Sequence, residues 1–126
     1  MLVTKPLAII FHDRLLPGSR VATGLADLGW RVIEAKQPSE IGRLVRAEHP
    51  LLVICELNSR FFELGTEIAA LQRAPETSHV PFLGYCDPRN QQMTTDALAA
   101  GVSMVVGDVG ICDQLPQLLD QVLAVE

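Results

Sequence analysis

Five short apolar runs alternate along this chain with longer segments that carry apolar residues at helical spacing. This alternation is typical of βαβ units, in which helices connect parallel strands and cover the sheet that the strands form. The run from Leu51 to Cys55 contains no charged residue, which predicts a strand that is buried on both faces. The sequence therefore predicts an α/β protein built around a five-stranded parallel sheet.

The expected strands and helices follow one another in strict alternation. Strands are expected over residues 7–11, 30–35, 51–55, 81–85 and 103–106, and helices over about 20–28, from Pro38, over about 62–73 and 90–100, and from about Asp113. The length of 126 residues fits one domain, 1–126. Right-handed crossovers favour a flavodoxin-like (βα)5 three-layer sandwich with the strand order 2-1-3-4-5.

Charge and cysteine content exclude several classes of protein. The net charge of −5 argues against a nucleic-acid-binding surface, and we interpret the scattered arginines, Arg14 among them, as solvated. Cys55, Cys86 and Cys112 are odd in number and lack a CxxC spacing, which favours a reducing cytoplasmic location over disulfides or a zinc site. No apolar stretch approaches the ~20 residues of a membrane span, so we expect no membrane contact.

Polar residues follow three of the apolar runs, at the points where the expected strands end. They are His12 and Asp13 after the first run, Glu56 after the third, and Cys86 with Asp87 after the fourth. Because ligands of open α/β sheets bind outside the carboxyl ends of the strands, these residues form the candidate site. Asp13 and Glu56 could hold Mg²⁺ with the carbonyl of Asn58, or the cluster could be satisfied by water and backbone N–H groups.

Three stretches carry a resemblance to a known family. Residues 50–57, Pro-Leu-Leu-Val-Ile-Cys-Glu-Leu, resemble the third strand and acceptor position of the receiver domain of two-component response regulators, the CheY-like superfamily. Residues 80–84 and 99–106 resemble the fourth strand and the Ala-Gly turn with the fifth strand of that domain. The resemblance extends from Lys5 to Ala124 and implies the same flavodoxin-like fold.

The resemblance also implies a role for each candidate position. Glu56 stands at the family's phosphoacceptor aspartate, and Asp13 is the one carboxylate left of an acidic pair that includes His12. The family's Ser or Thr after the fourth strand, its Lys after the fifth strand and its aromatic switch residue correspond to Cys86, Asp108 and Val105.

These departures predict an atypical receiver, a pseudo-receiver with a degenerate phosphorylation site. Glu56 lengthens the acceptor by one methylene, which spoils an in-line geometry, and Asp108 places negative charge where a phosphoryl group needs a cation. The thiol of Cys86 is a weaker hydrogen-bond donor than a hydroxyl. Mg²⁺ is the only cofactor that the pattern suggests. Whether Glu56 mimics a phosphorylated aspartate or only fills an inactive site stays open.

A phosphorylation-independent receiver has to act through protein contacts. We expect a non-enzymatic, stand-alone module that binds a histidine kinase, a regulator or a second copy through its fourth helix, fifth strand and fifth helix, where Gln91, Gln92, Thr94 and Thr95 give a polar, weakly charged surface. The alternatives are conventional phosphorylation of an acidic residue by a histidine kinase, and a small flavodoxin-like enzyme or nucleotide binder. No GxGxxG or GxxxxGK[ST] motif supports the last of these.

Two adjacent aromatic residues follow the third strand. Phe61 and Phe62 cannot both face the core at the start of a helix, so one of them could contact a partner. The other interpretation, which we favour from the sequence, is that both fold over Leu57.

Overall fold

Alternating strands and helices fill the chain in the computed structural model, which describes residues 5–58 and 61–123. The strands are β1 (Leu7–Phe11), β2 (Arg31–Ala35), β3 (Leu52–Glu56), β4 (Phe82–Cys86) and β5 (Met104–Gly107). The helices are α1 (Leu15–Asp27), α2 (Pro38–Glu48), α3 (Phe61–Arg73), α4 (Gln91–Ala100) and α5 (Leu115–Leu123). The predicted order of elements is therefore confirmed.

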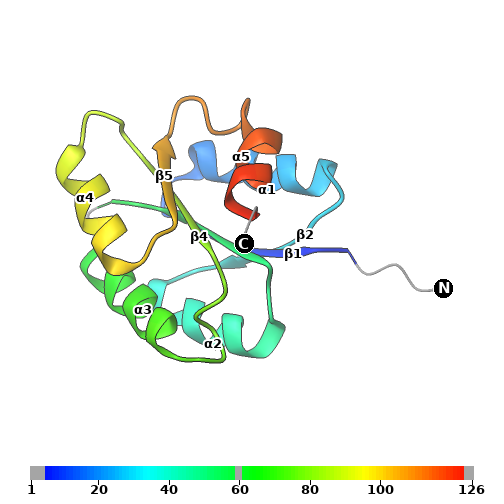
Figure 1. Cartoon of the computed structure of the whole chain (residues 1–126). Coiled ribbons are helices and arrows are strands. Elements are labelled where there is room, and N and C mark those ends of the chain that lie inside the picture. The colour runs from blue at the N-terminus through cyan, green and yellow to red at the C-terminus, as the bar shows by residue number, and fades with distance from the viewer. Residues whose placement is uncertain (1–4, 59–60, 124–126) are drawn as a thin grey trace.

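The five strands form one parallel sheet in the order β2-β1-β3-β4-β5. Helices α1 and α5 cover one face of the sheet, and α2, α3 and α4 cover the other, so the molecule has three layers (Figure 1). This is the flavodoxin-like architecture that the apolar runs predicted. All five residues of the central strand β3 are buried, as expected for a strand covered on both faces.

Alternation along the strands divides the core into two clusters. In β1, Ile9 and Phe11 pack toward α2, α3 and α4, whereas Ala8 and Ile10 pack toward α1 and α5. Successive side chains of a strand point to opposite faces, so each inner strand supplies both clusters. The sheet is thus held between two apolar layers, which fixes the positions of the loops at its edges.

The structure corrects several predicted boundaries. Strands β3, β4 and β5 each end one residue later than predicted, so Glu56 is the last residue of β3 and not the first residue of a loop. Helix α1 begins at Leu15, five residues before the predicted start, with a non-helical break at Leu16. Helix α5 begins at Leu115 and not near Asp113. Backbone hydrogen bonds from Leu57 N–H to the Tyr85 carbonyl and from Asp108 N–H to the Cys86 carbonyl extend the strand pairing beyond the apolar runs, and apolar periodicity does not report such bonds.

Helix α4 shows how local sequence sets an element's ends. The side chain of Asn90 accepts a hydrogen bond from the backbone N–H of Met93 and caps the first turn. Gly101 ends the helix with a φ of 119°, a left-handed conformation that favours glycine. Within residues 5–58 and 61–123, none of the helices combines the length and the apolar character needed to cross a bilayer.

Candidate functional site

The candidate site lies at the carboxyl ends of β1, β3 and β4. A cavity of about 580 Å³ opens there, lined by the loops that follow these strands. Glu56, at the end of β3, lines this cavity, and its side chain is fully buried. A buried carboxylate requires hydrogen-bond donors or a cation close by, so the partners of Glu56 define what this site can do.

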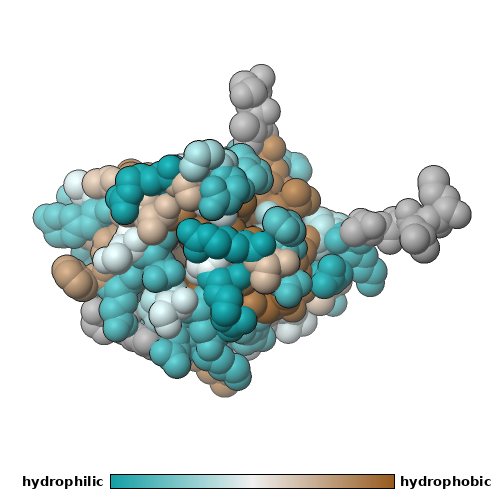
Figure 2. Space-filling view, turned by 90° about the horizontal axis from the view of Figure 1, so that it is seen from below, coloured by the Kyte–Doolittle hydropathy of each residue, from teal (hydrophilic) through white to brown (hydrophobic). Residues whose placement is uncertain are grey.

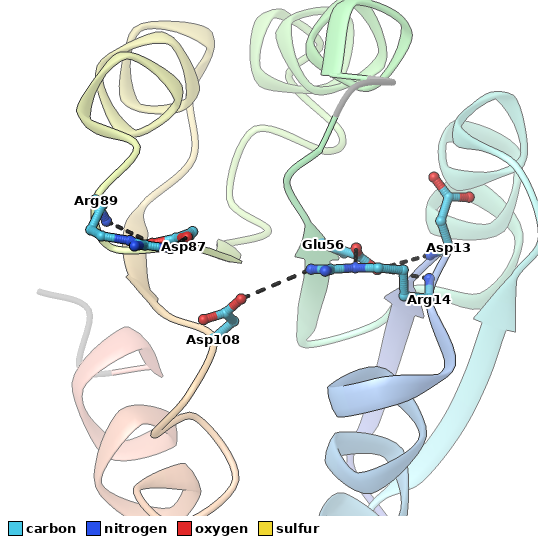
Figure 3. Close-up of polar contacts among 6 residues, drawn as sticks. All are labelled: Asp13, Arg14, Glu56, Asp87, Arg89 and Asp108. Atoms are coloured by element: carbon cyan, nitrogen blue, oxygen red, sulfur yellow. Dashed lines mark hydrogen bonds and ion pairs between the residues drawn. The ribbon is translucent and has the colours of Figure 1, made fainter.

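Three N–H groups from the loop after β1 surround the Glu56 carboxylate (Figure 3). Its Oε1 accepts hydrogen bonds from the backbone N–H of Asp13 at 3.0 Å and of Arg14 at 3.1 Å. Its Oε2 accepts a hydrogen bond from Nε of the Arg14 side chain at 2.8 Å. Both oxygens of the Glu56 carboxylate, which stands at the acceptor position, therefore accept hydrogen bonds from N–H groups of the chain itself.

Arg14 connects this carboxylate to the opposite side of the site. Its Nη2 lies 3.9 Å from Oδ2 of Asp108, in the loop after β5, so the guanidinium lies between Glu56 and Asp108 (Figure 3). The hydrogen bond to Glu56 raises the pKa of Arg14, and the negative charges of Glu56 and Asp108 act in the same direction. A cation from the β1 loop thus lies between the two acidic positions that the sequence singled out.

Arg14 is exposed, as expected for a solvated arginine, but the prediction missed its ion pair with Glu56. Its side chain is 64% exposed, yet its Nε end is bound to a carboxylate that is fully buried. The available signal was position, because Arg14 directly follows the His12-Asp13 pair at the end of the first strand. An arginine at the edge of a predicted acidic site is a candidate ion-pair partner.

Asp13 and Asn58 form a second contact at the mouth of the site. The Asn58 side chain donates a hydrogen bond from Nδ2 to Oδ2 of Asp13 at 2.8 Å. The structure thus brings together Asp13, Glu56 and Asn58, the three possible Mg²⁺ ligands of the sequence analysis. Asp13 contacts Glu56 through its backbone N–H, however, whereas its carboxylate points away from Glu56 (Figure 3).

His12 faces the edge of the sheet. Its Nδ1 lies 2.9 Å from the carbonyl oxygen of Arg14, and its Nε2 lies 3.2 Å from Oε1 of Glu34 at the end of β2. Its ring also packs against Gly18 of α1. His12 therefore holds the backbone of the loop that carries Arg14, and does not face the Glu56 carboxylate.

The remaining predicted positions, Cys86 and Val105, lie on β4 and β5. Cys86 lines the cavity, with its Sγ 3.9 Å from the hydroxyl of Thr94. Burial raises the pKa of this thiol, which agrees with a structural role. Val105 lies in β5, half-buried, and packs against the cluster under α2, α3 and α4.

Asp87, next to Cys86, is held by Arg89. The Arg89 side chain donates hydrogen bonds to both Asp87 oxygens, from Nε at 3.1 Å and from Nη2 at 2.7 Å. These bonds, with one from the Arg89 backbone, lower the pKa of Asp87 to about 2. The exposed pair fixes the start of the loop between β4 and α4.

We predict that a ¹³C NMR titration of the Asp87 carboxyl gives a midpoint near this value. A carboxylate with a depressed pKa stabilises the fold above its unfolded pKa of about 3.9, and this contribution disappears as the pH falls toward 2. In Arg89→Gln the midpoint should rise toward the unfolded value. An unchanged midpoint in that variant would contradict the role of Arg89.

Tyr85 places a phenol hydroxyl on the strand next to Glu56. It pairs in register with Glu56, and its side chain is fully buried in the cluster under α1 and α5. Its hydroxyl has no hydrogen-bond partner within the described part of the chain. Burial raises the pKa of this phenol, and the charge of Glu56 raises it further.

We expect Tyr85→Phe to stabilise the fold by about 1 kcal/mol, because a buried hydroxyl without a partner loses its hydration without compensation. Urea unfolding should give a higher midpoint with an unchanged slope. A loss of stability in Tyr85→Phe would mean that the hydroxyl is hydrogen-bonded, for example to a buried water molecule.

Comparison with solved structures identifies the fold. The chain matches a presumed response regulator from Chloroflexus aurantiacus with a TM-score of 0.87 and 16% identity, over 97% of this chain and 100% of that one. The receiver domain of the sensor histidine kinase PA1611 from Pseudomonas aeruginosa matches over the same shares, with a TM-score of 0.84 and 12% identity. The chemotaxis response regulator CheY4 of Vibrio cholerae matches with a TM-score of 0.82 and 17% identity, over 95% of this chain and 100% of that one.

These matches define the class of the fold. The chain has the CheY-like receiver fold, as the resemblance in the sequence predicted. No family model and no curated protein matches the sequence.

Magnesium is the cofactor that the sequence suggested for this site. The PA1611 receiver structure has a magnesium ion coordinated in its active-site cleft. In the present chain both oxygens of Glu56 accept hydrogen bonds from N–H groups, and the Arg14 side chain places a positive charge next to them. The described residues also contain no group of three or more His, Cys, Asp or Glu side chains that could hold a metal ion. These donors do not fit a magnesium ion while Arg14 is bound to Glu56.

Proposed function

We propose that this chain is a receiver-like module of two-component signal transduction that works without phosphorylation, through contacts with other proteins. The observation that carries the proposal is the Arg14–Glu56 ion pair at 2.8 Å. Phosphoryl transfer to a carboxylate needs a free oxygen in line with the phosphorus atom and cations around the transferred group. Here the carboxylate oxygens are engaged, and the nearby cation is used to neutralise Glu56 itself.

The charges around the site support the same conclusion. A phosphoryl group would add about two negative charges close to Asp13, Asp87 and Asp108, which all lie at this end of the sheet. Asp108 already shares Arg14 with Glu56. No lysine lines the cavity among the described residues. The site is therefore better suited to hold a fixed ion pair than to accept a phosphoryl group.

The proposal predicts that acetyl phosphate with Mg²⁺ leaves the intact mass of the protein unchanged, because neither oxygen of Glu56 is free to attack. A conventional receiver domain treated in parallel should gain the mass of one phosphoryl group. A stable adduct on this chain that disappears in Glu56→Gln would overturn the proposal and support conventional phosphorylation. An adduct that disappears only in Asp13→Asn would move the acceptor to Asp13.

For the partner surface we propose the face formed by α4, β5 and α5. Strand β5 is an edge strand whose four residues are only half-buried, and Leu98 on α4 is 50% exposed. Gln91 and Gln92 add neutral polar groups on α4. Apolar area with few charges is the composition of the core of a protein interface. The partner is a histidine kinase, another regulator or a second copy of the chain.

A charge placed on this face tests it. Leu98→Asp should abolish binding to the partner, or dimerisation, while circular dichroism shows an unchanged fold. Binding that survives in Leu98→Asp would exclude this face.

A further inference from the structure

The first turn of α3 carries an aromatic side chain that the fold does not bury. Phe62 is 86% exposed, whereas Phe61 is half-buried beside the core. The prediction that both fold over Leu57 was therefore wrong for Phe62. Figure 2 views the molecule from the side of α2 and α3, where hydrophilic side chains cover most of the face, with smaller apolar areas between them. One exposed phenylalanine does not define a binding site, so its surroundings decide what it can do.

A groove runs beside Phe62, between α3 and α4. It has a volume of about 600 Å³, and its mostly apolar lining includes Phe61, Phe62, Gly65, Ala69, Met93 and Ala100. The small residues on both helices leave room between them for an inserted side chain. A volume of this size lies within the range of pockets that take a small ligand, so the groove has room for a large side chain of a partner.

A second hollow lies on the other side of Phe62. It has a volume of about 320 Å³ between the start of α2 and α3, and Phe62 and Thr66 line both hollows. Phe62 thus stands between two depressions. An extended or helical segment laid across α3 would cover the ring of Phe62 and reach into both of them.

Carboxylates surround this surface. Asp96 lines the groove, and Glu63 and Glu67 line the second hollow, whereas no lysine or arginine lines either one among the described residues. The carboxylate of Asp96 accepts a hydrogen bond at 2.8 Å from the amide of Gln92, a neutral group that leaves its negative charge in place. An apolar groove with acidic residues at its sides favours an occupant that is apolar in the middle and positively charged around it.

We propose that the α3–α4 groove binds a short basic, amphipathic segment of a partner protein, with one large apolar side chain seated beside Phe62. A second copy of the chain fits less well, because it would bring the same carboxylates, and a second net charge of −5, against this surface. The proposal does not depend on whether Glu56 is phosphorylated.

The groove is continuous with the candidate site. Asn58 and Met93 line both the groove and the cavity above Glu56. Asn58 also donates its hydrogen bond to Asp13. A segment bound in the groove would therefore contact a residue that holds the loop after β1.

Selection from a random peptide library displayed on phage tests the proposal. We expect the wild-type protein to enrich peptides with a large apolar residue flanked by Lys or Arg. In fluorescence anisotropy, these peptides should bind Phe62→Ala and Asp96→Lys at least about tenfold more weakly than the wild type. The matched control is Leu28→Ala, which removes an apolar side chain of 47% exposure at the end of α1, on the opposite face of the sheet, and should leave binding unchanged.

Three outcomes would overturn the proposal. The first is a failure to enrich peptides, or enrichment without positive charge. The second is equal binding of the selected peptides to the wild type and to Phe62→Ala, when circular dichroism shows that both proteins are folded. The third is a dimer in sedimentation velocity that Phe62→Ala dissociates, because the occupant would then be a second copy. None of these outcomes decides whether acetyl phosphate modifies Glu56, so the proposed function is tested separately.

Discussion

Replacing Glu56 with alanine is expected to destabilise the fold by about 3 kcal/mol. The carboxylate is fully buried and accepts the backbone N–H groups of Asp13 and Arg14. Glu56→Ala would leave these two donors without their acceptor and a cavity where the side chain was. Urea unfolding measures the loss, with the slope as a check that the unfolded state is unchanged.

Glu56→Gln separates hydrogen bonding from charge. The amide oxygen can still accept both backbone N–H groups, and Arg14, whose side chain is 64% exposed, can turn into solvent. Removing one partner of an ion pair is costly when the other charge stays buried and unpaired, but here the remaining charge is exposed, so we expect a change within about 1 kcal/mol. If Glu56→Gln were as costly as Glu56→Ala, the stabilising feature would be the charge and not the pair of backbone hydrogen bonds.

Gly18→Ala is expected to cost about 2 kcal/mol, although alanine is the better residue for a helix. A Cβ at Gly18 would lie 2.2 Å from Cγ and 2.6 Å from Cβ of His12, at the root of a side chain that cannot rotate away. Such overpacking costs up to about 3 kcal/mol, and the gain of about 1 kcal/mol in helix propensity does not offset it. His12 also lies within hydrogen-bonding distance of the Arg14 carbonyl, so its displacement should move the loop that carries Arg14.

Gly110→Ala is the matched control for this prediction. Its added Cβ would have no neighbour nearer than 3.8 Å, an ordinary van der Waals contact. Thermal unfolding should therefore separate the two variants. Equal melting temperatures for Gly18→Ala and Gly110→Ala would mean that the His12 ring moves without cost and does not fix the loop.

Much of the fold could be predicted from apolar periodicity. The uninterrupted run at Leu51–Cys55 located the central strand, and the alternation of runs with helical segments predicted the parallel sheet, for which right-handed crossovers favoured the observed strand order. Burial dominates the energetics of these elements, and periodicity reports burial directly. The meeting of the Asp13 and Glu56 segments followed from the same pattern, because parallel strands present their carboxyl ends at one edge.

The partners within the site could not be predicted in the same way. The ion pair of Arg14 with Glu56 depends on the path of the loop between Phe11 and Leu15 and on the rotamer of a long side chain. The exposure of Phe62 depends on how α3 is rotated about its axis relative to the sheet. The helix begins at Phe61, one residue before the predicted start. Such details are set by tertiary packing, which no local pattern in the sequence records.

The most direct test of the Arg14–Glu56 pair is the Nε–Hε signal of Arg14 in ¹H–¹⁵N NMR spectra, assigned by its absence in Arg14→Lys. Because Nε donates to a buried carboxylate, we expect a resolved, slowly exchanging signal. It should stay unchanged when Mg²⁺ and acetyl phosphate are added in excess, since Arg14 occupies the oxygens that either group would need. A signal that shifts progressively with Mg²⁺, or disappears on addition of acetyl phosphate, would show that Arg14 leaves Glu56 and that the site is open to phosphorylation.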